Sequence, residues 1–462
     1  MSVTTPVQTL SRAAHGRPAA PVRIVHLGVG NFFRAHQAWY TEHAPDAADW
    51  GIAAFTGRSA AIADALRPQE GLYTLITRGA HGDEFEVISS LSAVHAADEH
   101  AALLGYFRSP ALAVVTLTVT EAGYRRGADG GLDLADAAVA ADLASLREAY
   151  DAPVTTAPAR IVAGLLARRA AGLGPLAIVS CDNLSGNGEV LARVVGDFAA
   201  QVDASLPRWL ADHIAFGTTM VDRITPATTD EHRAAVLAAL GVADAAPVPT
   251  EPFAEWVIQG EFPAGRPAWD AAGARIVDDV EPFERRKLAL LNGSHSLLAY
   301  AATILGHETV ADAIADPRCQ AWVEQWWDEA CSHLPLPDAE LLAYREALLD
   351  RYRNPNIRHA LAQIASDGSL KLPVRIVPTL RAELAAGRVP EGAARAVAAW
   401  VLHLRGLGAP VKDVNDAAVL PLAEGSLDDT IAGVLGYLGL SGEPELAASV
   451  RRLADELRSL AD

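Results

Sequence analysis

Short apolar runs recur along the first 280 residues. They occupy positions 23–27, 52–55, 72–76, 112–120, 176–180 and 214–221. The run 112–120 is apolar and β-branched, as expected for a strand covered on both faces. Stretches rich in Ala, Leu, Glu and Arg, such as 135–150 and 158–171, lie between the runs. This alternation predicts a Rossmann-type, doubly wound parallel sheet with helices on both faces.

The pattern changes after about residue 280. Strand signals fade, and long amphipathic stretches rich in Ala and Leu follow at 282–305, 310–333, 339–353 and 393–405. We therefore expect an α/β dinucleotide-binding domain over 1–280 and a mostly α-helical, substrate-binding domain over 281–462. A chain of 462 residues has the length of two such domains.

Composition excludes several classes of protein. The formal charge of −19 disfavours nucleic acid or an anionic membrane as a partner. The three cysteines are widely spaced and form no CxxC pair, so neither a disulfide framework nor a zinc site is expected. Neither a signal peptide nor a membrane span is apparent. We expect a reduced, cytoplasmic protein.

A glycine turn follows the first apolar run. Gly28 permits a tight turn, and Gly30 leaves room for a pyrophosphate at a helix start. With Asn31 and Phe32 they form the predicted cofactor site. Phe33 occupies the position of the usual third glycine, so we expect looser packing of the helix there. NAD(P) is the expected ligand, and a methyl-donor nucleotide is the alternative.

The second strand ends without an acid. The sequence there is Thr56-Gly57-Arg58-Ser59, whereas an acidic residue would bind the ribose hydroxyls of NAD. Arg58 and Ser59 suit a 2′-phosphate, although Arg58 would stack on adenine with either cofactor. The choice between NAD and NADP stays open.

Lysine is scarce, since only three of the 38 basic residues are lysines. A buried lysine can give up its proton, whereas arginine cannot. In a regular helix Lys287, His295 and Asn292 would lie at about 0°, 80° and 140° on one side. Alcohol oxidation needs a base, commonly a zinc-bound water, a Tyr-x-x-x-Lys pair or a lone lysine. The chain has no metal-ligand spacing and no Tyr-x-x-x-Lys, which leaves Lys287.

Seven motifs carry a family resemblance. They lie at 28–36, 72–75, 118–124, 180–188, 220–226, 287–295 and 367–373. With them the chain resembles, from about residue 22 to 460, the mannitol 2-dehydrogenase family of long-chain polyol dehydrogenases. The resemblance implies metal-free hydride transfer between a nicotinamide and a polyol by a monomeric enzyme.

The resemblance also implies roles for individual residues. Lys287 is the general base, Asn183 and Asn292 flank the reacting oxygen, and Glu121 relays protons. His295, Asp222 and Lys371 border the substrate.

Most of these residues also have a purely structural interpretation. Asn183 lies beyond an apolar strand, where α/β sheets bind ligands; the alternative is an asparagine that forms the turn before Gly186. Glu121 ends an apolar run, where an unpaired buried carboxylate would be costly. The alternatives are a core histidine for His295, an ion pair with Arg223 for Asp222, and a turn-closing contact for Lys371.

The substrate is open at this stage. Mannitol-oxidising members of the family place arginine where this chain has Gln363, and the surrounding sequence is closer to the fructuronate reductase branch. Arg358 is then a candidate for binding a carboxylate. The mannitol–fructose pair is the first expectation and the mannonate–fructuronate pair the second. A non-catalytic sugar or nucleotide sensor and a methyltransferase are the alternatives from other classes.

Overall fold

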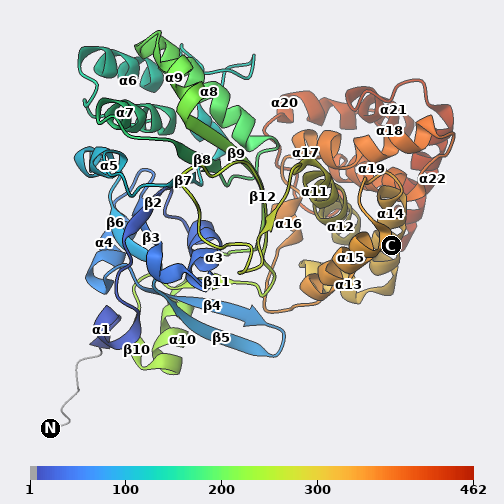
Figure 1. The fold of residues 1–462 in the computed structure, drawn as a ribbon. Helices are drawn as coiled ribbons and strands as arrows, with labels where there is room; N and C mark the ends of the chain where they lie inside the picture. The colour runs from blue at the N-terminus through green and yellow to red at the C-terminus, as the bar shows by residue number, and fades with distance from the viewer. Residues whose placement is uncertain (1–7, 462) are drawn as a thin grey trace. The chain divides into compact units, whose positions relative to one another are not determined.

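The computed structural model describes residues 8–461, which divide into two compact units between Val280 and Glu281 (Figure 1). The first unit contains an eight-stranded sheet in the order β13-β12-β9-β8-β7-β2-β3-β6. Its strands are β2 (Val22–Leu27), β3 (Gly51–Phe55), β6 (Leu91–His95), β7 (Val114–Leu117), β8 (Leu176–Ser180), β9 (Ile214–Asp222), β12 (Glu255–Gln259) and β13 (Arg275–Ile276).

The strands from β6 to β9 are parallel and run in the Rossmann order, with the first strand, β2, in the middle. β12 is antiparallel to β9. The predicted doubly wound sheet is confirmed. The sequence did not predict β6, β12 or β13, and the predicted run 112–120 extends past β7 over residues 118–120, which form a loop.

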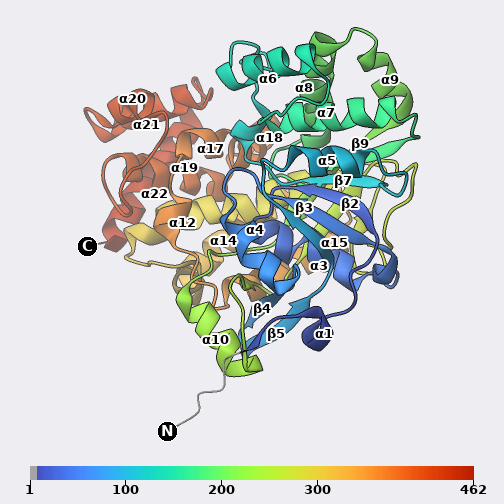
Figure 2. The same ribbon diagram turned by 90° about the vertical axis from the view of Figure 1, so that its left-hand side faces the viewer.

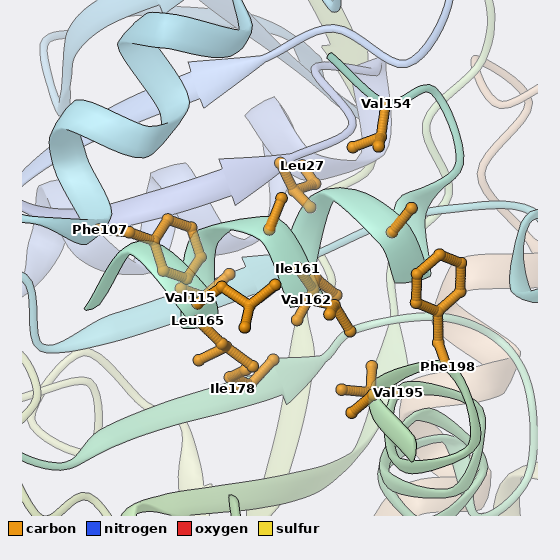
Figure 3. Packing of buried hydrophobic residues seen from close by; sticks show 14 of the residues in the cluster. Leu27, Phe107, Val115, Val154, Ile161, Val162, Leu165, Ile178, Val195 and Phe198 are labelled. Carbon is orange, nitrogen blue, oxygen red and sulfur yellow. The ribbon is translucent and has the colours of Figure 1, made fainter. Parts of the chain in front are cut away.

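Two apolar layers cover the sheet because successive strand residues face opposite sides. Val25, Val115 and Ile178 belong to one layer, whereas their neighbours Ile24, Val114 and Ala177 belong to the other. Figure 3 shows the first layer, where side chains of the strands meet those of the covering helices. These helices are α5 (His100–Phe107), α6 (Ala137–Glu148), α7 (Ala157–Ala170), α8 (Asn187–Val202) and α9 (Leu206–His213).

The opposite layer contains α2 (Asn31–Ala35), α3 (Gln37–His43) and α4 (Ala61–Leu66). The apolar run 72–76 belongs to β4 (Tyr73–Gly79), which lies outside the main sheet and pairs with β5 (Gly82–Ile88) and β11 (Val248–Thr250). Only two residues separate β4 from β5, and so short a turn joins antiparallel strands. The other strands and α-helices of this unit are β1 (Gln8–Thr9), α1 (Arg12–His15), α10 (Asp230–Leu240) and β10 (Val242–Ala243), and short 3₁₀ turns lie at Ala47–Asp49, Arg67–Gln69 and Glu121–Tyr124.

The second unit is helical, as predicted. Its helices are α11 (Glu281–Arg286), α12 (Ser294–Ile304), α13 (Val310–Ala315), α14 (Pro317–Cys331), α15 (Asp338–Tyr352), α16 (Leu361–Ile364), α17 (Gly368–Arg375), α18 (Val377–Ala385), α19 (Glu391–Leu404), α20 (Asp416–Val419), α21 (Leu427–Tyr437) and α22 (Pro444–Ala461). α12 and α19 are buried almost all round and pack against each other, which makes them the core of the unit. Figure 2 shows both helices among the others of this unit. Among residues 8–461, no helix is long and apolar enough to cross a membrane.

Candidate functional site

The glycine turn has the geometry that its sequence predicts. Gly28 has a φ of +114°, and a Cβ there would lie 2.1 Å from the carbonyl oxygen of Thr118. Only glycine fits this backbone. A Cβ on Gly30 would meet no atom within 4 Å, so the chain is open to an approaching ligand at that point.

Phe33 does not loosen the helix, contrary to the sequence expectation. Its fully buried ring stacks on the imidazole of His26. His26 in turn contacts Thr116 Oγ1 through Nδ1 (2.8 Å) and Thr118 Oγ1 through Nε2 (3.0 Å). Burial lowers the pKa of His26 to about 3, so the imidazole under the turn is neutral.

A cavity of about 710 Å³ opens beside this turn, at the carboxyl ends of β2, β3, β7 and β8. Its size is that of a ligand pocket, and parallel sheets bind ligands at this edge. Seven of the predicted site residues line it: Gly28, Gly30, Asn31, Phe32, Arg58, Glu121 and Asn183. The structure therefore brings together residues that lie up to 155 positions apart in the sequence.

Asn31 has a second task in this cavity. Its Nδ2 donates to the carbonyl oxygen of Pro226 (2.8 Å), and its Oδ1 accepts from Arg34 (2.7 Å). The side chain thus fixes the loop at Pro226. Phe32 is half-buried and stacks on His36.

A second cavity of about 800 Å³ shares Gly28 and Arg58 with the first. It also contains Arg160, which the sequence reading missed. Arg160 is buried, donates to the carbonyl oxygen of Thr56 (3.2 Å) and lies over the ring of Phe55. Burial lowers the pKa of Arg160 to about 10. The sequence signal that could have identified Arg160 is a charged residue on the apolar face of a predicted helix.

Asn183 is exposed at the rim of the first cavity. The turn before α8 depends instead on Asn187, whose Nδ2 donates to the carbonyl oxygens of Asp182 and Thr219 (both 2.8 Å). Asn187 also accepts from the Thr219 amide (3.0 Å). Asn187, four residues after Asn183, therefore stabilises this turn.

Glu121 is not the buried carboxylate that we expected. Its side chain is 72% exposed and pairs with Arg126 at 2.8 Å. The β7 strand ends at Leu117, and Glu121 begins a short 3₁₀ turn, Glu121–Tyr124, outside the apolar layer. A functional role for Glu121 is therefore supported by its position in the cavity wall and not by burial.

Asp222 is buried at the end of β9, opposite Glu255 of β12. The neighbouring guanidinium of Arg223 donates to the carbonyl oxygens of Ala35 (2.5 Å) and Glu251 (3.2 Å) and lies over the ring of Trp39. Arg223 therefore supports the backbone around the end of β9.

Lys287 begins a π-helix, Lys287–Gly293, between α11 and α12, so the regular helix expected over 282–305 is wrong at this point. In a π-helix each N–H bonds the carbonyl five residues back. Asn292 is five residues after Lys287 and lies one turn above it, not at the 140° offset of a regular helix. Both side chains are half-buried.

Side-chain donors satisfy the carbonyls of this wide turn. Trp326 donates to Ala289 and Trp327 to Leu290, each at 2.9 Å. The next carbonyls, of Leu291 and Asn292, accept from Ser294 (3.1 Å) and Arg375 (3.4 Å). Donors from α14 and α17 thus stabilise a backbone that is rare in proteins.

His295 is buried, with its ring 5.0 Å from those of Tyr352 and His359. Its Nε2 has no hydrogen-bond partner within residues 8–461. Burial lowers its pKa well below the usual value, and the charges of His359, Arg351 and Arg375 add to this. The imidazole is a neutral group with a donor or acceptor still available.

The two remaining candidates of the second unit are placed differently. The Lys371 amine donates to the carbonyl oxygens of Ile364 (3.0 Å) and Ser366 (2.5 Å), so it closes the turn before α17. Burial lowers its pKa. Arg358 is exposed, and its neighbour His359 is the residue of that segment that contacts His295.

One group in the described part of the chain, His307, Asp316 and Cys319, has donor atoms close enough to hold a metal ion. The Asp316 carboxylate already accepts from Arg318 (2.7 Å) and contacts His307 (3.2 Å). Asp316 also caps α14, because its Oδ1 accepts from the backbone amide of Arg318 (2.9 Å), so structural contacts account for this cluster.

Two family models match the chain, the mannitol dehydrogenase Rossmann domain over residues 22–271 and the mannitol dehydrogenase C-terminal domain over residues 279–436. D-Mannonate oxidoreductase of Escherichia coli (strain K12) is 40% identical over 83% of this chain and 80% of its own.

Two solved structures are similar over nearly the whole chain. Substrate-free D-sorbitol dehydrogenase has a TM-score of 0.90 and 29% identity, covering 99% of this chain and 97% of its own. The ternary complex of Pseudomonas fluorescens mannitol 2-dehydrogenase with NAD and D-mannitol has a TM-score of 0.79 and 34% identity, covering 99% and 95%. These matches confirm the expected class, an NAD(P)-dependent oxidoreductase.

Proposed function

Because the chain belongs to the mannitol dehydrogenase family, we propose that it oxidises a secondary hydroxyl of a linear sugar alcohol to a ketone, and catalyses the reverse reduction. Mannitol and fructose are the first candidate pair. The observation that carries the proposal is the cavity that joins the glycine turn to Glu121 and Asn183.

The first unit fits a nicotinamide dinucleotide. The open side of Gly30 admits a pyrophosphate. The two cavities that share Gly28 and Arg58 have room for the two nucleoside ends of the dinucleotide. The cofactor, when bound, supplies the hydride acceptor or donor. We propose that Asn31 and Phe32 shape this wall and that Arg58 contacts the ribose end.

The proposed chemistry rests on an amine and two amides. Lys287 takes the hydroxyl proton during oxidation and returns it during reduction. Asn183 and Asn292 donate N–H groups to the oxygen as its negative charge develops. Glu121, exposed at the cavity wall, passes the proton towards solvent. Since these groups provide both base and donors, we expect no requirement for a metal ion.

Three further residues are proposed to border the substrate. The Nε2 of His295 is available for a substrate hydroxyl. Asp222 ends a strand beside the loop that contributes Thr225 to the cavity. Lys371 is proposed to shape the substrate site indirectly, by closing the turn before α17.

A sugar acid is the second candidate substrate, with D-mannonate and fructuronate as the pair. The positive charges of Arg351 and Arg375 contribute to the lowered pKa of His295, after burial and His359, so this imidazole lies in the field of two arginines. A guanidinium binds a carboxylate through two parallel hydrogen bonds. The 40% identity to a D-mannonate oxidoreductase supports the same choice. Arg358, exposed on the same segment as His359, is a further candidate for this contact.

Steady-state kinetics on four alcohols test the proposal. Mannitol, sorbitol, arabinitol and D-mannonate are each assayed with NAD and with NADP by nicotinamide absorbance, and fructose and fructuronate in reverse. The highest kcat/KM identifies the pair. Absence of turnover with every compound would contradict the proposed reaction and favour a sensor.

A further inference from the structure

Asp182 is a buried carboxylate in the wall of the first cavity, next to Asn183. Its Oδ1 accepts from the backbone amide of Val119 at 2.6 Å. Its Oδ2 accepts from the hydroxyl of Tyr124 at 2.5 Å and from that of Ser180 at 3.1 Å. Tyr124 and Ser180 are also buried, so water does not compete for these bonds.

These bonds connect the two segments that carry proposed catalytic groups. Val119 and Tyr124 lie on either side of Glu121, two residues before it and three residues after it. Asp182 is adjacent to Asn183 and follows β8. A single side chain therefore fixes the loop after β7 and the loop after β8 relative to each other.

The carboxylate is held at an energetic cost. No cation within residues 8–461 forms an ion pair with Asp182, and its three donors are neutral. Burial raises its pKa to about 6, although the hydrogen bonds oppose this. A buried carboxylate that has hydrogen bonds but no ion-pair partner still loses solvation free energy on folding. Stability alone therefore does not account for an aspartate at this position.

We propose that Asp182 is a positioning residue, which sets Glu121 and Asn183 at the separation required for proton transfer and for stabilising the substrate oxygen. The inference rests on the proposed function for its kinetic consequence, but the connection between the loops stands on the geometry alone. Asp182 itself touches no reacting atom in this scheme.

Two variants test the proposal in the full-length protein, Asp182→Asn and Tyr124→Phe. We expect Asp182→Asn to lower kcat at least tenfold with KM and cofactor Kd changed less than threefold. Tyr124→Phe removes one of the three donors and is expected to lower kcat less. The double variant should be no worse than Asp182→Asn, because both changes break one network.

Asp244→Asn is the matched control. Asp244 is also buried and accepts from the amides of Thr74 (2.5 Å) and Ala246 (2.8 Å), but it lines neither cavity. It should keep kcat within twofold. An equal loss in Asp244→Asn, or a kcat within twofold of wild type in Asp182→Asn, would overturn the proposal.

Amide hydrogen exchange separates this inference from the proposed reaction. Asp182→Asn should accelerate exchange in both 118–124 and 182–186, whereas Asp244→Asn should leave both segments unchanged. Unchanged exchange in either segment of Asp182→Asn would refute the connection, even if the wild-type protein turned over none of the substrates. Absence of wild-type turnover with accelerated exchange would contradict only the reaction.

Discussion

The imidazole of His26 and the phenyl ring of Phe33 lie face to face, with 3.5 Å between their centroids and 8° between their planes. His26 belongs to β2 and Phe33 to α2, so the stack joins the strand and the helix on either side of the glycine turn. A flat imidazole gives the phenyl ring a surface to pack against, which explains why this turn needs no third glycine.

Phe33→Ala should reduce the free energy of unfolding by about 3–5 kcal/mol, because a buried aromatic ring is replaced by a cavity. Phe33→Leu, which keeps most of the volume, should cost about 1.5 kcal/mol or less. Urea denaturation measures both. Equal midpoints for Phe33→Ala and the wild type would show that the stack does not stabilise the domain.

Lys287→Ala should lower kcat by roughly 10²–10⁴-fold, the usual range for loss of a general base. Isothermal titration should find the cofactor Kd within a few-fold of wild type. Lys412→Ala is the control, since Lys412 is an exposed lysine of a loop in the same unit. Near-normal rates in Lys287→Ala would remove the base assignment.

Arg58→Asp should lower the ratio of kcat/KM with NADP to that with NAD by about tenfold or more, because a charged hydrogen bond contributes roughly 1.5–3 kcal/mol. Arg58 is exposed where both cavities open, so the change should leave stability almost unaffected. An unchanged ratio would mean that Arg58 does not contact the 2′-phosphate.

Gly293→Ala should destabilise the second unit by about 1–3 kcal/mol, because the new Cβ would lie 2.7 Å from the Trp326 ring. It should also lower kcat by displacing the π-helix. Gly196→Ala is the matched control. Gly196 lies inside α8 with no atom within 4 Å of its ideal Cβ, so alanine should stabilise by about 0.5–1 kcal/mol. Thermal melts compare the two.

Stability should fall as the pH is lowered from 6.5 to 5. Burial lowers the pKa of His26 to about 3 and those of His359 and His403 to about 4. In this window the unfolded chain binds protons that the folded chain does not, so each histidine contributes a slope of up to about 1.4 kcal/mol per pH unit. Asp182 opposes the trend, because its raised pKa lets the folded protein bind a proton first.

Urea midpoints at pH 7.5 and 5.5 measure this slope. His26→Gln removes one titrating group and should give a shallower dependence. An unchanged slope in that variant would show that His26 titrates equally in the folded and unfolded protein.

Local pattern predicted the sheet, the helical second unit and the glycine turn, because strand and helix periodicities depend on nearby residues. The π-helix was not predictable in this way. Its carbonyls depend on Trp326 and Trp327, more than thirty positions further along the chain. Glu121 was misjudged because the apolar run 112–120 continues past the point where β7 ends. Arg160 was missed because a helix pattern does not show which cavity a buried charge faces.

The wide turn between Lys287 and Gly293 couples the length of the chain to the packing of its neighbours. Removing one residue from it would let an ordinary helix form, in which backbone amides would bond the carbonyls that now accept from Trp326 and Trp327. The two buried indole N–H groups would then lose their acceptors, which is costly in a protein interior. We therefore expect a deletion in this turn to be tolerated less well than a substitution.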